Sequence, residues 1–154
     1  MSYNARKRSK ISRFTFRQQY ETERCSTIIK KKEDTYSKWE RGINDFSVEF
    51  ANELANLYNV SLDYLFGLCN NSEKCINRKI NNSLIKERLI LLRKEKKLTQ
   101  IELSQILGYH QRTYAHYETG DVLPTIYKLY YIALYYDVSL DYLSGRSNRK
   151  NRLG

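Results

Sequence analysis

An internal repeat is the feature of this sequence that most constrains its fold. The hexapeptide VSLDYL occurs at Val60–Leu65 and returns 78 residues later at Val138–Leu143, each time with a glycine two positions beyond it. At the same offset other identical residues align without a gap: Tyr36, Glu40, Gly42, Ala55 and Tyr58 with Tyr114, Glu118, Gly120, Ala133 and Tyr136. Self-similarity at a fixed offset indicates a tandem duplication of one small structural unit.

Length and polarity predict how the two copies are arranged along the chain. With 154 residues, of which 41% are hydrophobic, there is room for two very small domains. An Asn-rich polar stretch, NNSEKCINRKINNS, separates the copies and is typical of a linker. The predicted division is a basic tail (1–13), a first unit (14–69), the linker (70–83), a second unit (84–145) and a second basic tail (146–154).

The charge balance favours a polyanionic partner. Lys and Arg number 27 against 17 Asp and Glu, a net charge of +10, which suits nucleic acid or an anionic membrane surface. No apolar run reaches the about 18 residues that a membrane span needs. The first residues also lack the apolar core of a signal peptide. We therefore expect a cytoplasmic protein without a membrane partner.

Cysteine usage and the lack of catalytic motifs argue against an enzyme. Cys25, Cys69 and Cys75 are an odd number without a C-x-x-C pair, which suits reduced thiols better than disulfides or zinc. The sequence carries no nucleophile–base pair, carboxylate dyad or Gly-rich phosphate loop. We expect no catalytic residue, no metal and no cofactor.

Helix signals are dense in the second unit. Asn82 or Ser83 can cap a first helix. Thr99 can cap a second one, and Glu102 three residues later completes a capping box. Apolar residues recur at helical spacing on the faces expected to point inward: Leu84, Ile85, Leu89 and Leu92 in the first helix, and Leu103, Ile106 and Leu107 in the second.

Turn residues divide the remainder into three further helices. Gly108 can take the left-handed conformation that ends the second helix, and a third helix is expected at about residues 111–119. The remaining signals are Pro124 and Thr125 opening a fourth helix, and Ser139 with Asp141 capping a fifth one that ends at Gly145. The predicted fold class is all-α, with two small five-helix units in tandem, the first of them incomplete or degenerate.

The stretch between Thr99 and Gly120 carries a family pattern. T-Q-x-x-L-x-x-x-L-G followed by T-Y-x-x-Y-E-x-G resembles the lambda-repressor-like family, also called the Cro or XRE helix-turn-helix family. The match covers nearly all of residues 84–145. The resemblance implies a sequence-specific, double-stranded DNA-binding transcription regulator of the repressor kind, whose third helix enters the major groove.

The resemblance also implies site residues. It assigns phosphate contacts to Gln100, Thr99 and Thr113, base reading to Gln111, Arg112 and His116 with His110 at the mouth of the helix, and a structural pair to Arg93 and Glu118. The residue types agree with base reading, because Gln pairs bidentately with adenine and Arg with the O6 and N7 acceptors of guanine.

One of the two histidines departs from the family pattern. His110 stands where relatives mostly carry Ser or Thr, so the usual N-cap is missing. His110 and His116 are six residues apart and lie on different faces of a helix, which argues against a shared metal. An alternative stays open in which both are exposed polar residues without a dedicated role.

The fourth helix is aromatic where the first copy is polar. Glu49, Asn52, Glu53 and Asn56 correspond to Tyr127, Tyr130, Tyr131 and Leu134. Contiguous exposed aromatic surface is typical of an interface. We therefore expect these four residues to form a homodimer or inter-unit contact; the alternative is that the rings only enlarge the core.

The first unit lacks the front of the family pattern. Thr22, Thr15 and Lys30 replace Gln100, Arg93 and Gly108, and Glu33 with Asp34 take the places of Gln111 and Arg112. Two carboxylates there are repelled by phosphates, so we do not expect this unit to read DNA.

A shifted reading frame is one hypothesis for the missing front of the pattern in the first unit. Suitable codons for residues 23–30, read one base later, encode Lys-Asp-Val-Ala-Gln-Leu-Leu, a family-like helix. Ordinary divergence is the simpler alternative, and the gene sequence decides between them.

The sequence leaves two kinds of function in competition. The leading prediction is a transcription regulator that binds double-stranded DNA. The second is an antitoxin-like or protein-interaction module, in which a DNA-binding unit is joined to a surface that holds a protein partner.

Overall fold

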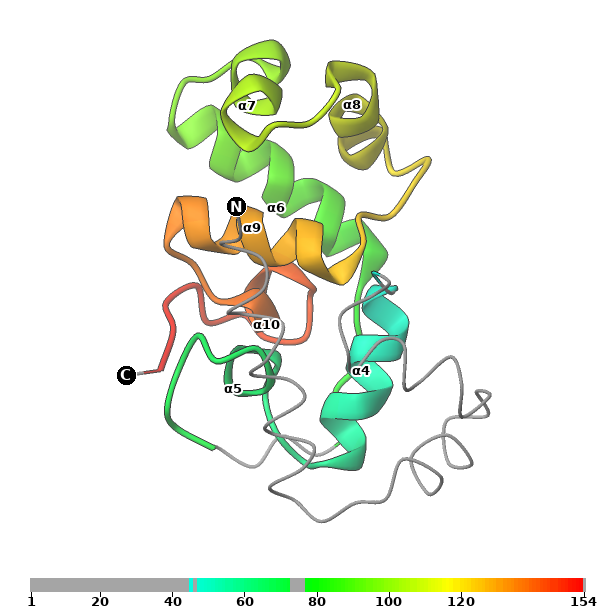
Figure 1. Ribbon diagram of the computed structural model, residues 1–154, viewed down its shortest axis with the longest axis vertical. Helices are drawn as coiled ribbons and strands as arrows, with labels where there is room; N and C mark the ends of the chain where they lie inside the picture. The colour runs from blue at the N-terminus through cyan, green and yellow to red at the C-terminus, as the bar shows by residue number, and fades with distance from the viewer. Residues whose placement is uncertain (1–44, 46, 73–76, 154) are drawn as a thin grey trace. The chain divides into compact units, whose positions relative to one another are not determined.

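The computed structural model describes residues 45, 47–72 and 77–153 (Figure 1). These fall into two compact units, one up to Arg78 with Leu153 added and one spanning Lys79–Arg152. All helices assigned in the described ranges are α-helices and no strand is found there, which confirms the predicted all-α fold class. Among the same residues, no helix is both long and apolar enough to cross a membrane.

The described part of the first unit contains two helices, α4 (Val48–Leu57) and α5 (Leu62–Leu65). Ser47 caps α4 by accepting a hydrogen bond from the backbone N–H of Phe50 at 3.2 Å. One apolar face of α4 and most of the following turn and α5 are buried: Val48, Phe50, Ala51, Leu54, Ala55, Val60, Leu62, Leu65 and Phe66.

The duplicated peptides adopt the same turn in both units. Asn59 and Asp137 end their helices in the left-handed conformation, with φ of 55° and 54°. The next residue then donates its N–H back to an alanine carbonyl, over 2.9 Å in the first unit and 3.0 Å in the second. Ser61 and Ser139 cap the short helix that follows. The sequence repeat is therefore also a structural repeat over these residues.

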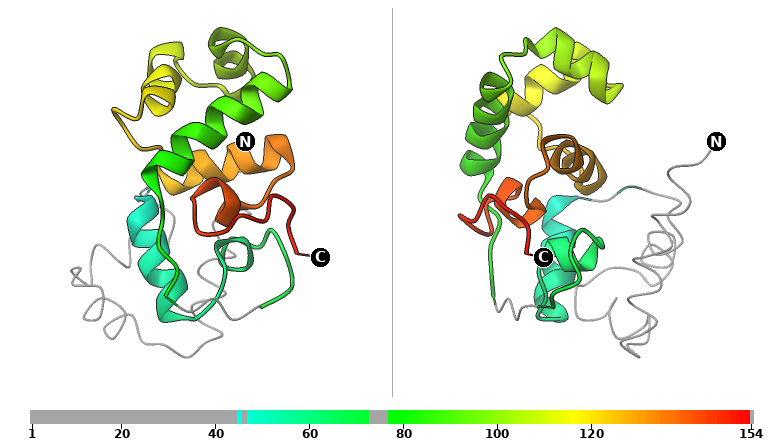
Figure 2. Two further views of the ribbon diagram at one scale, coloured as in Figure 1. Left: turned by 180° about the vertical axis from the view of Figure 1, so that it is seen from behind. Right: turned by 90° about the vertical axis from the view of Figure 1, so that its left-hand side faces the viewer.

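The second unit contains five helices around one core. They are α6 (Asn82–Glu95), α7 (Gln100–Leu107), α8 (Gln111–Thr119), α9 (Ile126–Tyr136) and α10 (Leu140–Leu143). Helix α6 packs against α8 and α10, α7 packs against α8, and α9 packs against α10. Figures 1 and 2 show α7 and α8 together at one end of this unit, away from α10. The pair thus forms a projecting end of the unit.

Two local predictions in this unit are wrong. Asn81 caps α6, because its side chain accepts from the N–H of Leu84 at 3.1 Å, so the helix starts one residue earlier than expected. Ile106 was expected to face inward, but it is 52% exposed. The buried residues of α7 are Leu103 and Ser104, and the side chain of Ile106 lies outside this narrow buried face.

The C-terminal segment after Gly145 folds back onto the second unit instead of forming a free basic tail. Arg146 is buried and its Nη1 lies 3.2 Å from a carboxylate oxygen of Asp141. The guanidinium of Arg152 donates to the carbonyls of Ala133 and Val138 at 2.8 and 3.0 Å, at the C-terminal end of α9. Cationic groups are favourable at that end of a helix dipole.

Arg88 of α6 holds the same segment from the other side. Its guanidinium lies over the ring of Tyr142, 4.0 Å from the centroid, and donates to the carbonyl of Tyr142. It also donates to the Ser147 carbonyl at 2.9 Å and to the Asn148 side chain at 2.8 Å. Arg88, Arg146 and Arg152 therefore stabilise the fold of the second unit.

Candidate nucleic-acid interface

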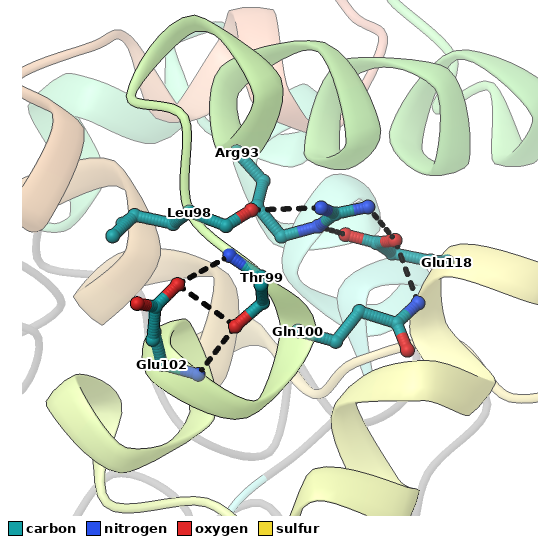
Figure 3. Close-up of polar contacts among 6 residues, drawn as sticks. All are labelled: Arg93, Leu98, Thr99, Gln100, Glu102 and Glu118. Carbon is teal, nitrogen blue, oxygen red and sulfur yellow. Dashed lines mark hydrogen bonds and ion pairs between the residues drawn. The ribbon is translucent and has the colours of Figure 1, made fainter.

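A capping box starts α7 (Figure 3). The hydroxyl of Thr99 accepts from the N–H of Glu102 at 3.2 Å, and the Glu102 carboxylate accepts from the Thr99 N–H at 2.7 Å. The same carboxylate oxygen accepts the Thr99 hydroxyl proton at 2.8 Å. These bonds from Thr99, first from its backbone and then from its hydroxyl, hold the pKa of Glu102 below its ordinary value.

The capping box argues against the phosphate contact that the family resemblance implied for Thr99. Its hydroxyl has one proton, and that proton is already donated to Glu102. A bond from this hydroxyl to a phosphate, as the family resemblance implied, would first have to break the contact with Glu102. The geometry of Thr99 is that of a helix cap.

Replacing Thr99 with Ala should lower the free energy of unfolding of the second unit by about 1 kcal/mol, because one N-terminal N–H of α7 loses its acceptor. Hydrogen exchange of the second-unit amides measures this loss. Gln105→Ala is the control, since Gln105 is exposed on the same helix and serves no cap. Equal stability of the Thr99 and Gln105 variants would show that the capping box does not stabilise α7.

The turn between α7 and α8 depends on Gly108 and Tyr109. Gly108 has φ +70°, and no atom lies within 4 Å of the place where a Cβ would stand, so the backbone conformation and not crowding is what favours glycine. The Tyr109 hydroxyl donates to the carbonyl of Lys128 at 3.3 Å, and the Lys128 ammonium lies 4.3 Å from the centre of the Tyr109 ring. Tyr109, which sequence reasoning did not single out, thus anchors the turn to α9.

Helix α8 divides into a buried and an open side. Tyr114, Tyr117 and Glu118 are buried, whereas Gln111 and Arg112 are exposed in its first turn. Among the other predicted site residues, Thr113 and His116 are half-buried, and His110 is exposed at the N-cap without a side-chain capping bond. The two side chains with the best base-pairing chemistry are therefore exposed in the first turn of the helix.

His116 contacts a residue that the family pattern did not indicate. Its Nδ1 lies 3.2 Å from a carboxylate oxygen of Asp121, and the same oxygen accepts from the Thr119 hydroxyl at 2.6 Å. The bonds from Thr119 and His116 hold the pKa of Asp121 below its ordinary value. The short Thr-Gly-Asp run after α8 was the sequence signal for this contact.

Arg93 and Glu118, predicted to pair, are in contact. Arg93 Nε and Nη2 lie 2.6 and 2.8 Å from the two carboxylate oxygens of Glu118, a bidentate geometry. Burial alone would raise the pKa of Glu118, but the hydrogen bonds from Arg93 and Gln100 outweigh it and the pKa lies below its ordinary value. Gln100, the predicted phosphate clamp, shares this carboxylate (Figure 3).

The predicted interface residues on α9 do not all lie at the surface. Tyr127, Tyr131 and Leu134 are half-buried, but Tyr130 is only 4% exposed and belongs to the core. Tyr130 follows Ile126 by four residues and so lies on the same buried face. Its ring meets that of Tyr131 edge to face, with the centroids 5.5 Å apart.

Comparison with known sequences decides the family. A sequence model of the helix-turn-helix family matches residues 27–65 and 89–143, which is more than half of the chain. The chain belongs to the helix-turn-helix family. The predicted membership of its Cro/XRE type is confirmed, and the two matched segments agree with tandem units.

Similar proteins come from bacteria and a phage. The chain is 41% identical over 59 residues to the uncharacterized HTH-type transcriptional regulator YobD of Bacillus subtilis, and 43% identical over 68 residues to the regulator YqaE of the same organism. It is 40% identical over 62 residues to the cryptic phage CTXphi transcriptional repressor RstR of Vibrio cholerae. These alignments cover 38, 44 and 40% of this chain and 53, 59 and 55% of the respective relatives. No solved structure matches.

Several predictions about the first unit fall outside the described residues. They concern Glu33 and Asp34, the substitutions at Thr15, Thr22 and Lys30, the shifted-frame hypothesis and the N-terminal basic tail. They stay predictions.

Proposed function

We propose that this chain is a transcription regulator that binds double-stranded DNA in a sequence-specific way, and that it acts as a repressor. Membership of the helix-turn-helix family supports DNA binding, and the likeness to a named phage repressor supports repression. The observation that carries the proposal is the exposure of Gln111 and Arg112 in the first turn of α8, next to the turn at Gly108. A helix presented in this way can enter the major groove with its first turn toward the bases.

We assign the roles by chemistry and exposure. Arg112 and Gln111 read base edges, since both carry bidentate groups on the open side of α8. His110 and His116 flank them and contribute single hydrogen bonds. Gln100 and Thr113 contact phosphates beside the groove, and the net charge of +10 supplies attraction that does not depend on sequence.

Fluorescence anisotropy with labelled DNA duplexes tests the proposal. The chain should bind duplex DNA, and the affinity should fall steeply as salt rises, because bound counterions are released from the phosphates. Adding unlabelled duplex should displace the label. Absence of binding at low salt to every duplex tried would contradict the proposed function.

Assembly follows from the proposal. A twofold pair of second units would present two α8 helices to half-sites about one helical turn apart, near 34 Å. We place the contact on α9, on Tyr127, Tyr131 and Leu134, and leave out the buried Tyr130. Half-buried tyrosines of this kind are enriched in interface cores.

Changing Tyr127 and Tyr131 to Glu, the residues found at the matching places of the first unit, should weaken self-association about tenfold or more, because interface aromatics carry much of the binding free energy. Sedimentation of the chain over a range of concentrations measures this. The matching change at Tyr130, to Asn, should instead destabilise the fold, since it removes a core ring. If wild type and the doubly substituted variant sediment alike, α9 does not carry the dimer contact.

A further inference from the structure

Glu118 is the point at which polar groups of three helices meet (Figure 3). Its carboxylate lies near the end of α8 and its side chain is 4% exposed. One carboxylate oxygen, Oε1, accepts from Arg93 of α6. The other, Oε2, accepts from Arg93 at 2.8 Å and from the side-chain amide of Gln100, the first residue of α7, at 2.9 Å.

Arg93 also holds the chain between α6 and α7. Its Nη1 donates to the carbonyl of Leu98 at 2.9 Å, directly before the capping box that starts α7. The guanidinium therefore connects Glu118 to the backbone that sets where α7 begins. Any displacement of the Glu118 carboxylate disturbs Gln100 directly and the start of α7 through Arg93.

The contact with Glu118 orients the amide of Gln100. An ionised carboxylate only accepts hydrogen bonds, so the amide nitrogen of Gln100, and not its oxygen, must face Glu118. The amide nitrogen carries two N–H groups. One is donated to Glu118, and the second remains for another acceptor at the N-terminal end of α7, where the helix dipole also favours an anion.

We propose that Glu118 is a positioning residue for DNA binding: it holds the Gln100 amide so that its second N–H is presented to a DNA phosphate. This inference rests on the proposed function. Glu118 also fixes the position of the phosphate contact relative to the base-reading helix, because Glu118 itself belongs to α8. Removing the carboxylate would let the Gln100 side chain turn freely. The amide that contacts the phosphate would then no longer be held in a fixed position relative to the base-reading residues of α8.

Double-mutant analysis tests this role. Gln100→Ala, Glu118→Gln and the double variant are compared by anisotropy on one short mixed-sequence duplex. Each single change should weaken binding about tenfold, and the double variant should be no weaker than the poorer single variant, since both remove the same contact. Glu95→Gln and Gln105→Ala are matched controls, the first in an exposed ion pair with Lys150 and the second exposed on α7.

Duplexes in which single phosphates are replaced by neutral methylphosphonates identify the contact. At one phosphate the replacement should weaken DNA binding by the wild type but not by the Gln100→Ala or Glu118→Gln variants. If Glu118 is purely structural, replacing that phosphate should weaken DNA binding by the Glu118→Gln variant as much as it weakens binding by the wild type. This result would overturn the proposal. Effects of the two single changes that multiply in the double variant would overturn it as well.

A measurement on the wild type keeps the test independent of whether the variants fold. Relaxation of the side-chain amide nitrogens should show Gln100 to be rigid on the nanosecond timescale and the exposed Gln105 to be mobile. Equal mobility of the two amides would contradict the proposed positioning. If no duplex binds while the Gln100 amide is rigid, the proposed function fails and the contact with Glu118 is structural only.

Discussion

A chain that ends at Gly145 is expected to lose about 3 to 5 kcal/mol of the free energy of unfolding of the second unit, because removing one partner of a buried ion pair leaves the other charge uncompensated. The charge in question is Asp141, whose side chain is 4% exposed and faces Arg146. Arg88 would also lose its acceptors on Ser147 and Asn148. Hydrogen exchange of the amides in α6 and α9 measures the loss.

A chain that ends at Arg152 is the control. It keeps every contact of the C-terminal segment described above and should match the full chain in stability. Arg152→Ala should have an intermediate effect, since it removes two bonds to carbonyls at the end of α9 but no buried ion pair. If the chain that ends at Gly145 is as stable as the full chain, residues 146–152 are a tail, as the sequence alone indicated.

The second large effect is expected in DNA recognition. Arg112→Ala should cost about 1 to 3 kcal/mol on the preferred DNA site and relax the preference at one base pair, because a bidentate contact to guanine is lost. Gln100→Ala should weaken binding to all sequences alike, since a phosphate contact carries no sequence information. Titration of the preferred duplex and of single base-pair variants measures both effects.

The first unit supplies the comparison. Glu33 and Asp34 occupy the places of Gln111 and Arg112 but repel phosphates, so replacing both with Ala should leave the preferred sequence unchanged and nonspecific affinity equal or slightly higher. The assignment of base reading to the second unit is wrong if Glu33 and Asp34 are needed to recognise a cytosine-containing half-site, or if Arg112 is dispensable.

Much of the second unit could be predicted because its signals are local. The capping box depends on Thr99 and Glu102, three residues apart, and the left-handed turn depends on Gly108 alone. Likewise, the repeated VSLDYL peptides contain their own cap, at Ser61 and Ser139. Such features need no knowledge of distant parts of the chain.

The errors arose where packing in the folded unit decides the outcome. Tyr130 was assigned to an interface by comparison with Asn52 of the first copy, although its spacing from Ile126 places it in the core. The arginines of residues 146–152 looked free because the sequence does not show that Asp141 of α10 and the carbonyls at the end of α9 face them in the folded unit. Charge alone cannot distinguish an arginine that meets a phosphate from one that caps a helix.

Selection of bound sequences from a pool of random DNA duplexes tests the central claim most directly, namely that the second unit reads DNA through the exposed first turn of α8. The full chain should enrich one motif that contains a guanine. The same selection with Arg112→Ala should yield a motif that has lost its preference at one position and keeps the rest. Recovery of no motif by the full chain, or of an identical motif by the Arg112→Ala variant, would contradict the claim.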